Sequence, residues 1–430
     1  MKLRGFFVWL HRYVGLAMAG FLIVEGLTGS LLAFGAEIDA LLDPRLSAAR
    51  PSPDAKPLDP ATLLERAAEA MPEAVVGYFT PRLSEDQVVL RMTWKNAGPP
   101  HVGEPDILIL DPWTGRELGR RPFSGEWTGN FRRDLMPFVF KLHTNLALGG
   151  LGGWLLGVVA LAWTLDCFVG FYLTLPVSRK KFWRRWRPAW LVKWRAGAYR
   201  INFDLHRAGG LWLWAMLFVF AWSSVELDSI TGFYGAVMGM FGSDPTEFIT
   251  RIYPDRPDIG PPKLDARAAQ ARGEALAEEI ASREGFHLLR PISLQYFSYA
   301  GRYNYSILTD RSFPQDRRLT VYFGSNSGEF AGMFETKAPL LGDTLNNWLL
   351  ALHQIRDPVD YLVYRILVAL TGVVIVLLSV TGIYIWWKKR AARLFSARRP
   401  LTASISAEAG ASDFNPGIFR RLYAALRRRQ

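Results

Sequence analysis

Cysteine is almost absent from this chain of 430 residues, which contains Cys167 alone. A single thiol can form neither an intrachain disulfide framework nor a cysteine-based metal site. The sequence also lacks a GxGxxG turn after a strand, a Walker A loop, a CxxCH haem-attachment motif and a recognisable Ser/His/Asp arrangement. These absences exclude the common signatures of nucleotide binding, covalent haem attachment and serine hydrolase chemistry.

Hydrophobic side chains are abundant: they make up 50% of the residues, and the chain contains 27 Phe and 16 Trp. Four apolar blocks reach the roughly 20 residues that a bilayer-spanning helix needs, at residues 13–34, 146–175, 208–225 and 362–387. The first block is longer than the apolar part of a typical signal peptide and includes Glu25, so we expect it to be retained. The sequence thus predicts a membrane protein with four transmembrane helices.

Positive charge is distributed unevenly around these blocks. The segment 177–205 contains nine Lys/Arg and one acidic residue, and the stretch after Trp387 contains eleven Lys/Arg and two acidic residues. The long loops reverse this balance, with 13 basic and 16 acidic residues in 36–142 and 13 basic and 18 acidic residues in 226–361. Because basic residues collect on the cytoplasmic side of a membrane, both termini are predicted to be cytoplasmic. The net charge of +12 therefore indicates topology, and we expect no nucleic-acid partner.

The two halves of the chain resemble each other. Leu-His-Arg opens the first block at 10–12 and the third at 205–207, and Leu-His precedes the second at 142–143 and the fourth at 352–353. The second and fourth blocks also end alike, in Gly-Phe-Tyr and Gly-Ile-Tyr. Parallel repeats of this kind are related by an axis along the membrane normal. We therefore expect a mainly α membrane protein, a four-transmembrane-helix bundle with a pseudo-twofold internal repeat and two periplasmic α+β units.

These expectations divide the chain into eight parts. The four transmembrane helices are expected within residues 1–35, 143–176, 206–228 and 353–388. The periplasmic units are expected at 36–142 and 229–352, the basic cytoplasmic loop at 177–205 and the basic cytoplasmic tail at 389–430. In the first unit, periodicity predicts a helix at 59–71 and strands at 74–80, 87–94 and 107–110. In the second unit it predicts a helix at 265–284 and strands at 292–299, 302–308 and 319–323.

Four of the six histidines lie at the edges of the apolar blocks, where an ionisable side chain is costly. The predicted topology places His11 and His206 at the cytoplasmic boundary and His143 and His353 at the outer boundary. Symmetry within the bundle would let each pair converge, and two facing histidines are suitable axial ligands for haem iron. We therefore predict two bis-histidine haems, held by His11/His206 and by His143/His353.

Two alternatives to haem ligation remain open at these histidines. A single histidine at a membrane interface is usually an amphipathic side chain without further role, although this does not explain the pairing. Zinc is the competing metal, but it requires more nitrogen or sulfur ligands than two histidines supply. The remaining histidines, His101 and His287, lie in the long loops and outside the pattern.

Charged residues near the histidines are further candidates. Arg12 and Arg207 directly follow the cytoplasmic pair and are predicted to bind haem propionates, with flanking positive charge as the equal alternative. Glu25, Asp166 and Glu226 lie within or beside the blocks. They would line a haem edge, hydrogen-bond a ligand imidazole or carry a proton.

Tryptophans recur among the arginines of the short basic loop, at Trp183, Trp186, Trp190 and Trp194, with an interruption at Pro188. This pattern predicts an interfacial helix that lies on anionic membrane lipids. Residues 414–429 of the tail show a similar pattern.

The first block, with WLHR at 9–12, EGLTG at 25–29 and EID at 37–39, resembles the PepSY-associated transmembrane family. The paired Leu-His motifs and the DPWTG segment at 111–115 resemble it as well, and the similarity covers roughly residues 1–390. Within that family, the chain looks most like iron-regulated inner-membrane proteins that act as ferric-siderophore reductases. The resemblance implies four spans, PepSY-like periplasmic units, haem b and reduction of ferric chelates that arrive in the periplasm.

The resulting expectation is an oxidoreductase of the bacterial inner membrane that reduces a ferric siderophore, or another Fe(III) chelate, and releases Fe(II). Because the sequence shows no nicotinamide or flavin domain, its electron donor would be a cytoplasmic reductase or a quinol. Two alternatives remain open. One is a haem module that passes electrons to a partner protein or the quinone pool. The other is a non-catalytic anchored protein whose PepSY-like units bind or inhibit a periplasmic partner.

Overall fold

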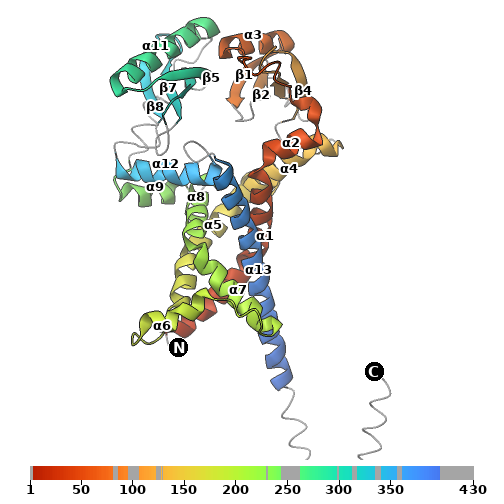
Figure 1. The fold of residues 1–430 in the computed structure, drawn as a ribbon, viewed down its shortest axis with the longest axis vertical. Helices are drawn as coiled ribbons and strands as arrows, with labels where there is room; N and C mark the ends of the chain where they lie inside the picture. Colours follow the sequence, from red (N-terminus) through yellow and green to blue (C-terminus); the bar gives the residue numbers. More distant parts are fainter. Residues whose placement is uncertain are drawn as a thin grey trace, which may run out of the picture.

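The computed structural model combines a long helical bundle with two small α+β units beyond one of its ends (Figure 1). The described residues are 3–80, 86–94, 106–122, 127, 129–228, 231–243, 262–297, 300–311, 317–334, 340–355 and 361–397. His101 and the basic segment 414–429 lie outside these residues.

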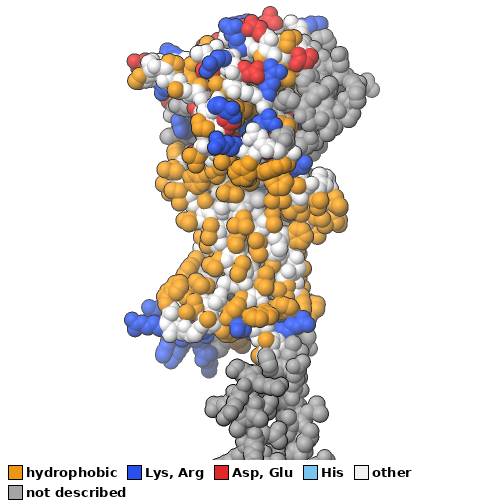
Figure 2. All heavy atoms as spheres, turned by 90° about the vertical axis from the view of Figure 1, so that its right-hand side faces the viewer, with side chains coloured by type: hydrophobic (Ala, Val, Ile, Leu, Met, Phe, Trp, Pro, Cys, Tyr) orange, Lys and Arg blue, Asp and Glu red, His pale blue; other side chains and the backbone are white. Residues whose placement is uncertain are grey.

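Among the described residues, three helices are long and apolar enough to cross a membrane: α1 (Leu3–Leu32), α5 (Gly150–Thr174) and α13 (Leu362–Ala397). Figure 2 shows a broad apolar band across one face of the bundle, with Lys and Arg gathered at the end away from the α+β units. A helix of about 20 apolar residues matches the thickness of the hydrocarbon core. The chain is therefore a multi-pass membrane protein.

The third apolar block differs from the single helix expected at 208–225. It is formed by α7 (Ala198–Trp212) and α8 (Trp214–Leu227), which are bent by 70° relative to each other. The bend lies at Leu213, whose backbone leaves the helical region (φ −108°, ψ 15°). Hydropathy reports the apolar composition of a block but not the direction of its backbone, so the sequence pattern could not reveal this bend.

The helices of the bundle pack in a ring. α1 lies between α13 and α5, and the α7–α8 pair closes the ring by packing against the same two helices. The closest approach is between Gly26 of α1 and Gly372 of α13, where a Cβ atom on Gly26 would lie 2.6 Å from the Gly372 carbonyl oxygen. Small residues at such crossings let helix backbones approach closely in a membrane.

Three further helices lie where the bundle faces the α+β units: α4 (Phe131–Asn145), α9 (Thr231–Gly239) and α12 (Leu341–Gln354). Figure 1 shows α9 and α12 lying across the bundle axis. His143 and His353 belong to α4 and α12, and not to the second and fourth transmembrane helices that were expected to begin at these histidines. The expected helix starts were wrong because the chain turns after each histidine. The turns lie at Leu146 (φ 52°) and Ile355 (φ 53°), which adopt the left-handed region although neither is Gly or Pro.

Each α+β unit contains one helix and a four-stranded antiparallel sheet with its strands in chain order. The first unit contains α3 (Pro60–Ala70), β1 (Ala74–Thr80), β2 (Val88–Trp94), β3 (Ile107–Leu110) and β4 (Glu117–Arg121). The second contains α11 (Ala266–Glu284), β5 (Leu288–Phe297), β6 (Arg302–Thr309), β7 (Arg318–Gly324) and β8 (Phe330–Phe334). The helix and three strands expected in each unit are confirmed to within a few residues. β4 and β8 are additional, and β4 (ELGRR) lacks the apolar alternation that identifies a strand.

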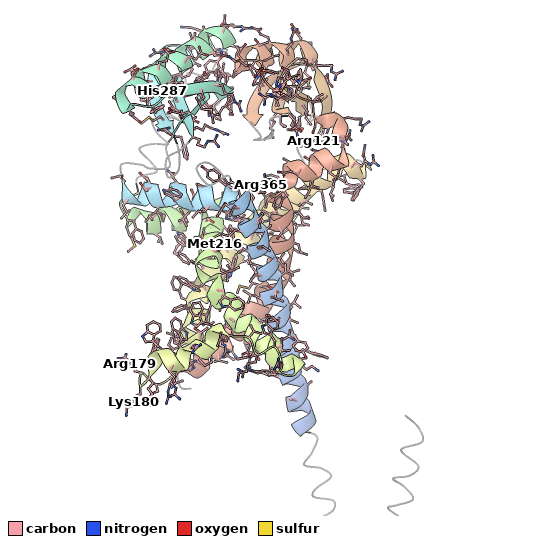
Figure 3. The ribbon with its side chains drawn as sticks, viewed as in Figure 1. Arg121, Arg179, Lys180, Met216, His287 and Arg365 are labelled. Carbon is pink, nitrogen blue, oxygen red and sulfur yellow. The ribbon has the colours of Figure 1, made fainter. Side chains whose placement is uncertain are left out.

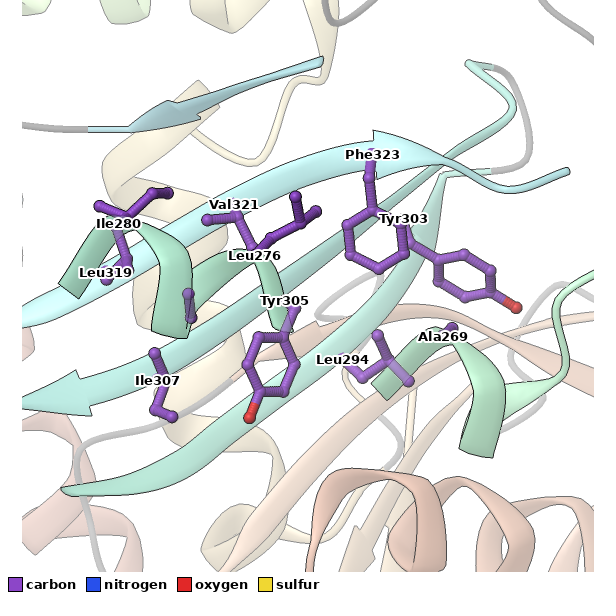
Figure 4. Packing of buried hydrophobic residues seen from close by; sticks show 11 residues of the cluster. Ala269, Leu276, Ile280, Leu294, Tyr303, Tyr305, Ile307, Leu319, Val321 and Phe323 are labelled. Atoms are coloured by element: carbon purple, nitrogen blue, oxygen red, sulfur yellow. The ribbon is translucent and has the colours of Figure 1, made fainter. Parts of the chain in front are cut away.

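Apolar side chains between α11 and the second sheet form the largest core of this unit (Figure 4). Tyr305 and Phe323 are fully buried in it. A Cβ atom on Gly273 of α11 would lie 2.5 Å from Cγ of Tyr305, so glycine lets the helix approach the sheet. Asp59 and Asp265 cap the first turns of α3 and α11 by accepting backbone N–H bonds.

The two units contact each other, and together we call them the cap. β1 lies beside β5, and α3 lies beside α11. Arg267 of α11 donates to both carboxylate oxygens of Glu65 at 2.8 Å and to the Thr62 hydroxyl at 2.8 Å. The side chain of Gln270 accepts the backbone N–H of Ala61 at 2.9 Å. The cap is thus held together by polar contacts between its helices.

Two arginines connect the bundle, the short helix α2 (Gly35–Leu42) and the cap (Figure 3). Arg365 of α13 donates to the Ala33 carbonyl at 2.8 Å and to the Glu37 carboxylate at 2.6 Å. Arg121 of β4 donates to Asp39 of α2 at 3.0 Å, and these two side chains are only 6% and 5% exposed. The 3₁₀ turn η1 (Pro44–Leu46) then leads into the first unit.

Removing one partner of the buried Arg121–Asp39 pair should destabilise the connection between bundle and cap. Because each variant takes an ion-pair partner away from a buried charge, we expect Asp39→Ala or Arg121→Ala to cost about 3–5 kcal/mol. Thermal unfolding in mild detergent measures the effect. The matched control is Arg66→Ala, which breaks the exposed Arg66–Glu69 pair and should cost at most about 1 kcal/mol. Equal losses in control and test variants would contradict the expected role.

The short basic loop forms a helix interrupted near Pro188, as the sequence indicated. α6 (Phe182–Trp186) passes into the 3₁₀ turn η2 (Arg187–Trp190). Trp183 and Trp194 are 74% and 67% exposed. Arg179 and Lys180 project from the same end of the bundle (Figure 3). Exposed tryptophans among basic side chains are typical of a segment at a lipid interface.

Candidate functional site

The first histidine pair lies at the end of the bundle remote from the cap. His11 of α1 hydrogen-bonds through Nδ1 to both carboxylate oxygens of Asp166 on α5, each at 2.9 Å. The Nδ1 atom of His206 on α7 faces the Leu378 carbonyl at 2.9 Å and the Thr381 hydroxyl at 3.2 Å, both on α13. The two ring centroids lie 6.0 Å apart, with the planes inclined by 59°. This pair therefore joins all four helical positions of the ring.

The second histidine pair lies at the end of the bundle that faces the cap. The Nδ1 atom of His143 on α4 lies 2.9 Å from the Thr28 hydroxyl and 3.0 Å from the Glu25 carboxylate, both on α1. The Nδ1 atom of His353 on α12 lies 2.6 Å from the Ser223 hydroxyl on α8. These ring centroids are 6.5 Å apart, with the planes inclined by 67°. The structure thus brings together the same two pairs that the sequence indicated.

The hydrogen-bond network indicates which ring nitrogen carries the proton. The hydroxyls of Thr28 and Ser223 donate to the carbonyls of Val24 and Val219 at 2.7 Å, which leaves each hydroxyl to accept from its histidine. The Leu378 carbonyl and the carboxylate oxygens of Asp166 and Glu25 are also acceptors. Each neutral imidazole therefore carries its proton on Nδ1 and an electron pair on Nε2. Among the described residues, no hydrogen bond occupies Nε2 in any of the four rings.

Glycines adjoin three of the four imidazoles. A Cβ atom at Gly29, Gly382 or Gly170 would lie 3.1, 3.2 or 3.5 Å from Cε1 of the adjacent histidine ring. The first two distances are tighter than ordinary side-chain contacts. The rings thus occupy positions that the backbone of the neighbouring helix leaves open, and larger residues there would displace them.

The ring separations fit two imidazoles that would share one metal. A metal–imidazole bond is about 2 Å long and the ring centre lies about 1 Å behind the bound nitrogen, so two imidazoles on opposite sides of one metal would have their ring centres roughly 6 Å apart. The observed separations of 6.0 and 6.5 Å match this value. Hydrogen bonding of Nδ1 to an acceptor is the usual way in which proteins orient a histidine that binds metal through Nε2. The residues present therefore fit bis-histidine haem iron at both positions.

The donor sets do not favour zinc. A structural zinc site needs four protein ligands and a catalytic one needs three. Within the part of the chain that the structure describes, no group of three or more His, Cys, Asp or Glu side chains is placed to hold a metal ion. Cys167 is buried in α5 and joins no such group.

Comparison with known protein families finds a match for most of the chain. A model of the PepSY-associated TM region matches residues 8–400, a span that includes all four histidines. The chain belongs to the PepSY-associated TM region family. No curated protein matches it.

One family-like segment of this PepSY-associated chain, EGLTG, lies at a histidine. It supplies three residues that surround His143: Thr28 hydrogen-bonds to the ring, the Glu25 carboxylate lies 3.0 Å from Nδ1, and Gly29 adjoins the ring. Asp166, considered in the sequence as a partner of a ligand imidazole, is bonded to His11. The segment that resembled the family in sequence is thus part of the site in three dimensions.

The two arginines of the PepSY-associated chain have different surroundings. The Arg207 guanidinium donates to Asp204, which is fully buried, at 2.8 Å and contacts the Pro188 carbonyl at 2.5 Å. These contacts fasten α7 to the basic loop and use part of the side chain that was predicted to bind a propionate; its Nε atom is buried and has no hydrogen-bond partner among the described residues. Arg12, which follows His11 in the chain, is half-buried and makes no hydrogen bond or ion pair within the described residues. Each arginine therefore keeps a donor for an anionic group.

Sequence reasoning missed most of the neutral partners of the histidines. Thr28 and Ser223 follow His11 and His206 at the same spacing, so the duplicated halves contained a signal for them. The Leu378 carbonyl carried no such signal, because any residue supplies a carbonyl. Glu226 lies beside Tyr234 and follows Ser223 by one turn of α8. His287 hydrogen-bonds to Asp310 in the cap, away from the bundle (Figure 3).

Proposed function

We propose that this protein transfers electrons across a membrane through two bis-histidine haems of the b type and reduces an Fe(III) chelate, such as a ferric siderophore. One observation carries the proposal: in both pairs, every Nδ1 faces an acceptor while every Nε2 is free of hydrogen bonds within the described residues, at a ring separation suited to a shared metal. Packing alone does not require two pairs of histidines to leave every Nε2 atom without a hydrogen bond.

The position of the pairs supports a path along the bundle. Thr28, the partner of His143, lies on the same helix as His11, and at about 1.5 Å per residue the two levels are roughly 25 Å apart along α1. This separation is close to the thickness of the hydrocarbon core, which is about 30 Å. A redox centre at each level would carry electrons from one face to the other.

We further propose that the protein lies in the bacterial inner membrane with both termini in the cytoplasm and the cap in the periplasm. The concentration of Lys and Arg at the end remote from the cap supports this orientation (Figure 2). The pseudo-twofold repeat read from the sequence is supported by the parallel roles of Thr28 and Ser223 and by the two similar units of the cap.

The residues of the chain would bind, orient and insulate the haems. The four histidines would hold the haem iron through Nε2, and their Nδ1 partners hold each ring at a fixed rotation. Arg12 is placed near the His11 level, where it would pair with a propionate. When bound, the haem iron supplies one-electron redox chemistry. Reduction of Fe(III) in an oxygen-rich chelate weakens the binding of the metal, because Fe(II) is a softer cation.

The rate at which a chelate re-oxidises the reduced protein tests this function. Purified protein is reduced under anaerobic conditions and mixed with a ferric siderophore or with the same siderophore loaded with gallium, which accepts no electron. We expect rapid re-oxidation of the haem spectrum by the ferric complex alone. A rate equal to the gallium control would instead favour a haem module that serves a protein or quinone partner. A colourless protein would favour the anchored binding protein.

A further inference from the structure

The partners of the four histidines differ in charge. His11 faces the Asp166 carboxylate, and His143 faces the Glu25 carboxylate together with a hydroxyl. His206 faces a carbonyl and a hydroxyl, and His353 faces a hydroxyl. Each level thus combines one histidine that has a carboxylate partner with one that has only neutral partners among the described residues.

The difference follows the two halves of the chain. Alignment of the Leu-His-Arg segments places Glu25 opposite Phe220, whose ring contacts His353 edge-on at 5.2 Å. Alignment of the Gly-Phe-Tyr and Gly-Ile-Tyr segments places Asp166 opposite Leu378, whose carbonyl faces His206. Both carboxylates therefore belong to the first half, at positions where the second half has apolar side chains.

Asp166 is the more strongly engaged of the two carboxylates. Both of its oxygens lie 2.9 Å from Nδ1 of His11, and its side chain is 8% exposed. Within the described residues it forms no ion pair with Lys or Arg, so no cation neutralises it at short range. Glu25 shares His143 with Thr28 and is 20% exposed. A charge in a poorly hydrated site acts more strongly on its neighbours than one near water.

We propose that Asp166 is a positioning residue that lowers the redox potential of the His11–His206 level below the value that a neutral acceptor would give. A carboxylate bonded to Nδ1–H increases electron donation by the imidazole and adds negative charge, and both effects favour Fe(III) over Fe(II). An electron delivered to this level by a quinol or a cytoplasmic reductase is then released more readily to the His143–His353 level. The inference rests on the proposed function, because it requires haem at the first pair.

Redox titration of a protein that keeps only the first haem provides the test. In the His143→Ala background, the remaining haem spectrum is titrated with and without Asp166→Asn. We expect the substitution to raise the midpoint potential by at least 59 mV, which is a tenfold change in the Fe(III)/Fe(II) ratio. Asp166→Glu should restore a value close to that of the parent. Thr381→Val, the matched loss of a neutral partner, should shift the potential by less than half as much.

The outcomes of this titration are distinguishable. A midpoint that is unchanged or lower in Asp166→Asn overturns the inference about Asp166, and two haems in the parent protein then leave the proposed function standing. If Asp166→Asn does not retain haem, the midpoint potential of Thr381→Asp is measured instead. A carboxylate added beside His206 should lower this potential, and an unchanged potential overturns the inference. Absence of haem from the unmodified protein overturns the proposed function itself.

Discussion

Replacing either histidine of the pair near the cap, by His143→Ala or His353→Ala, should abolish chelate reduction while the haem at the other pair remains reducible. Each substitution would remove one of the two proposed haem ligands, and no other His or Cys among the described residues forms a metal-binding group that could replace it. We expect haem content to fall to about half and the ferric-siderophore reaction to be lost. The two readouts are the haem absorbance per polypeptide and the re-oxidation rate after anaerobic reduction.

The control for this experiment is His287→Ala. His287 is an exposed cap histidine that pairs with Asp310, and its loss should change neither haem content nor rate. Undiminished chelate reduction in His143→Ala or His353→Ala would refute the assignment of the terminal electron-transfer site. Equal loss in His287→Ala would indicate a general effect on the fold.

Enlarging Gly26 should separate α1 from α13 and destabilise the bundle. A Cβ atom at this position would lie 2.6 Å from the Gly372 carbonyl oxygen and 3.0 Å from a methyl group of Val376, so one helix must move. We expect Gly26→Ala to cost about 1–3 kcal/mol, as is typical of overpacking. Gly26→Leu should prevent assembly of the site, because Glu25 and Thr28 flank this glycine and hold His143. Thermal unfolding in detergent and haem retention measure the two effects.

Gly20 offers a matched control on the same helix. A Cβ atom at Gly20 would meet nothing within 4 Å, so Gly20→Ala introduces a residue of higher helix propensity without a steric clash. We expect this substitution to stabilise α1 by up to about 1 kcal/mol. If Gly20→Ala and Gly26→Ala had the same effect, close packing at the α1–α13 crossing would not be the cause.

The sequence predicted which histidines meet better than it predicted the backbone path that brings them together. Hydropathy, charge and the duplicated Leu-His motifs were sufficient to pair His11 with His206 and His143 with His353, and the structure brings these rings together. The pairing was predictable because a repeated motif at the edge of a repeated apolar block fixes both depth and partner. That the rings bind haem remains a proposal.

Other features depend on the direction of the backbone, which composition does not encode. The bend between α7 and α8 arises at Leu213, whose backbone leaves helical geometry. His143 and His353 lie on helices separate from the membrane-spanning ones because the chain leaves helical geometry after each of them. Leu146 and Ile355 adopt the left-handed region without being Gly or Pro, so neither gave a turn signal. The sequence could not predict that the Leu378 carbonyl faces His206, because every residue has a backbone carbonyl.

The haem content of the purified protein tests the central claim most directly. The protein is expressed with adequate iron and haem supply, purified in mild detergent and assayed for haem per polypeptide, with spectra recorded before and after dithionite reduction. The account predicts close to two haems of the b type per chain, with low-spin features from bis-histidine ligation. A protein that carries no haem under these conditions would contradict it.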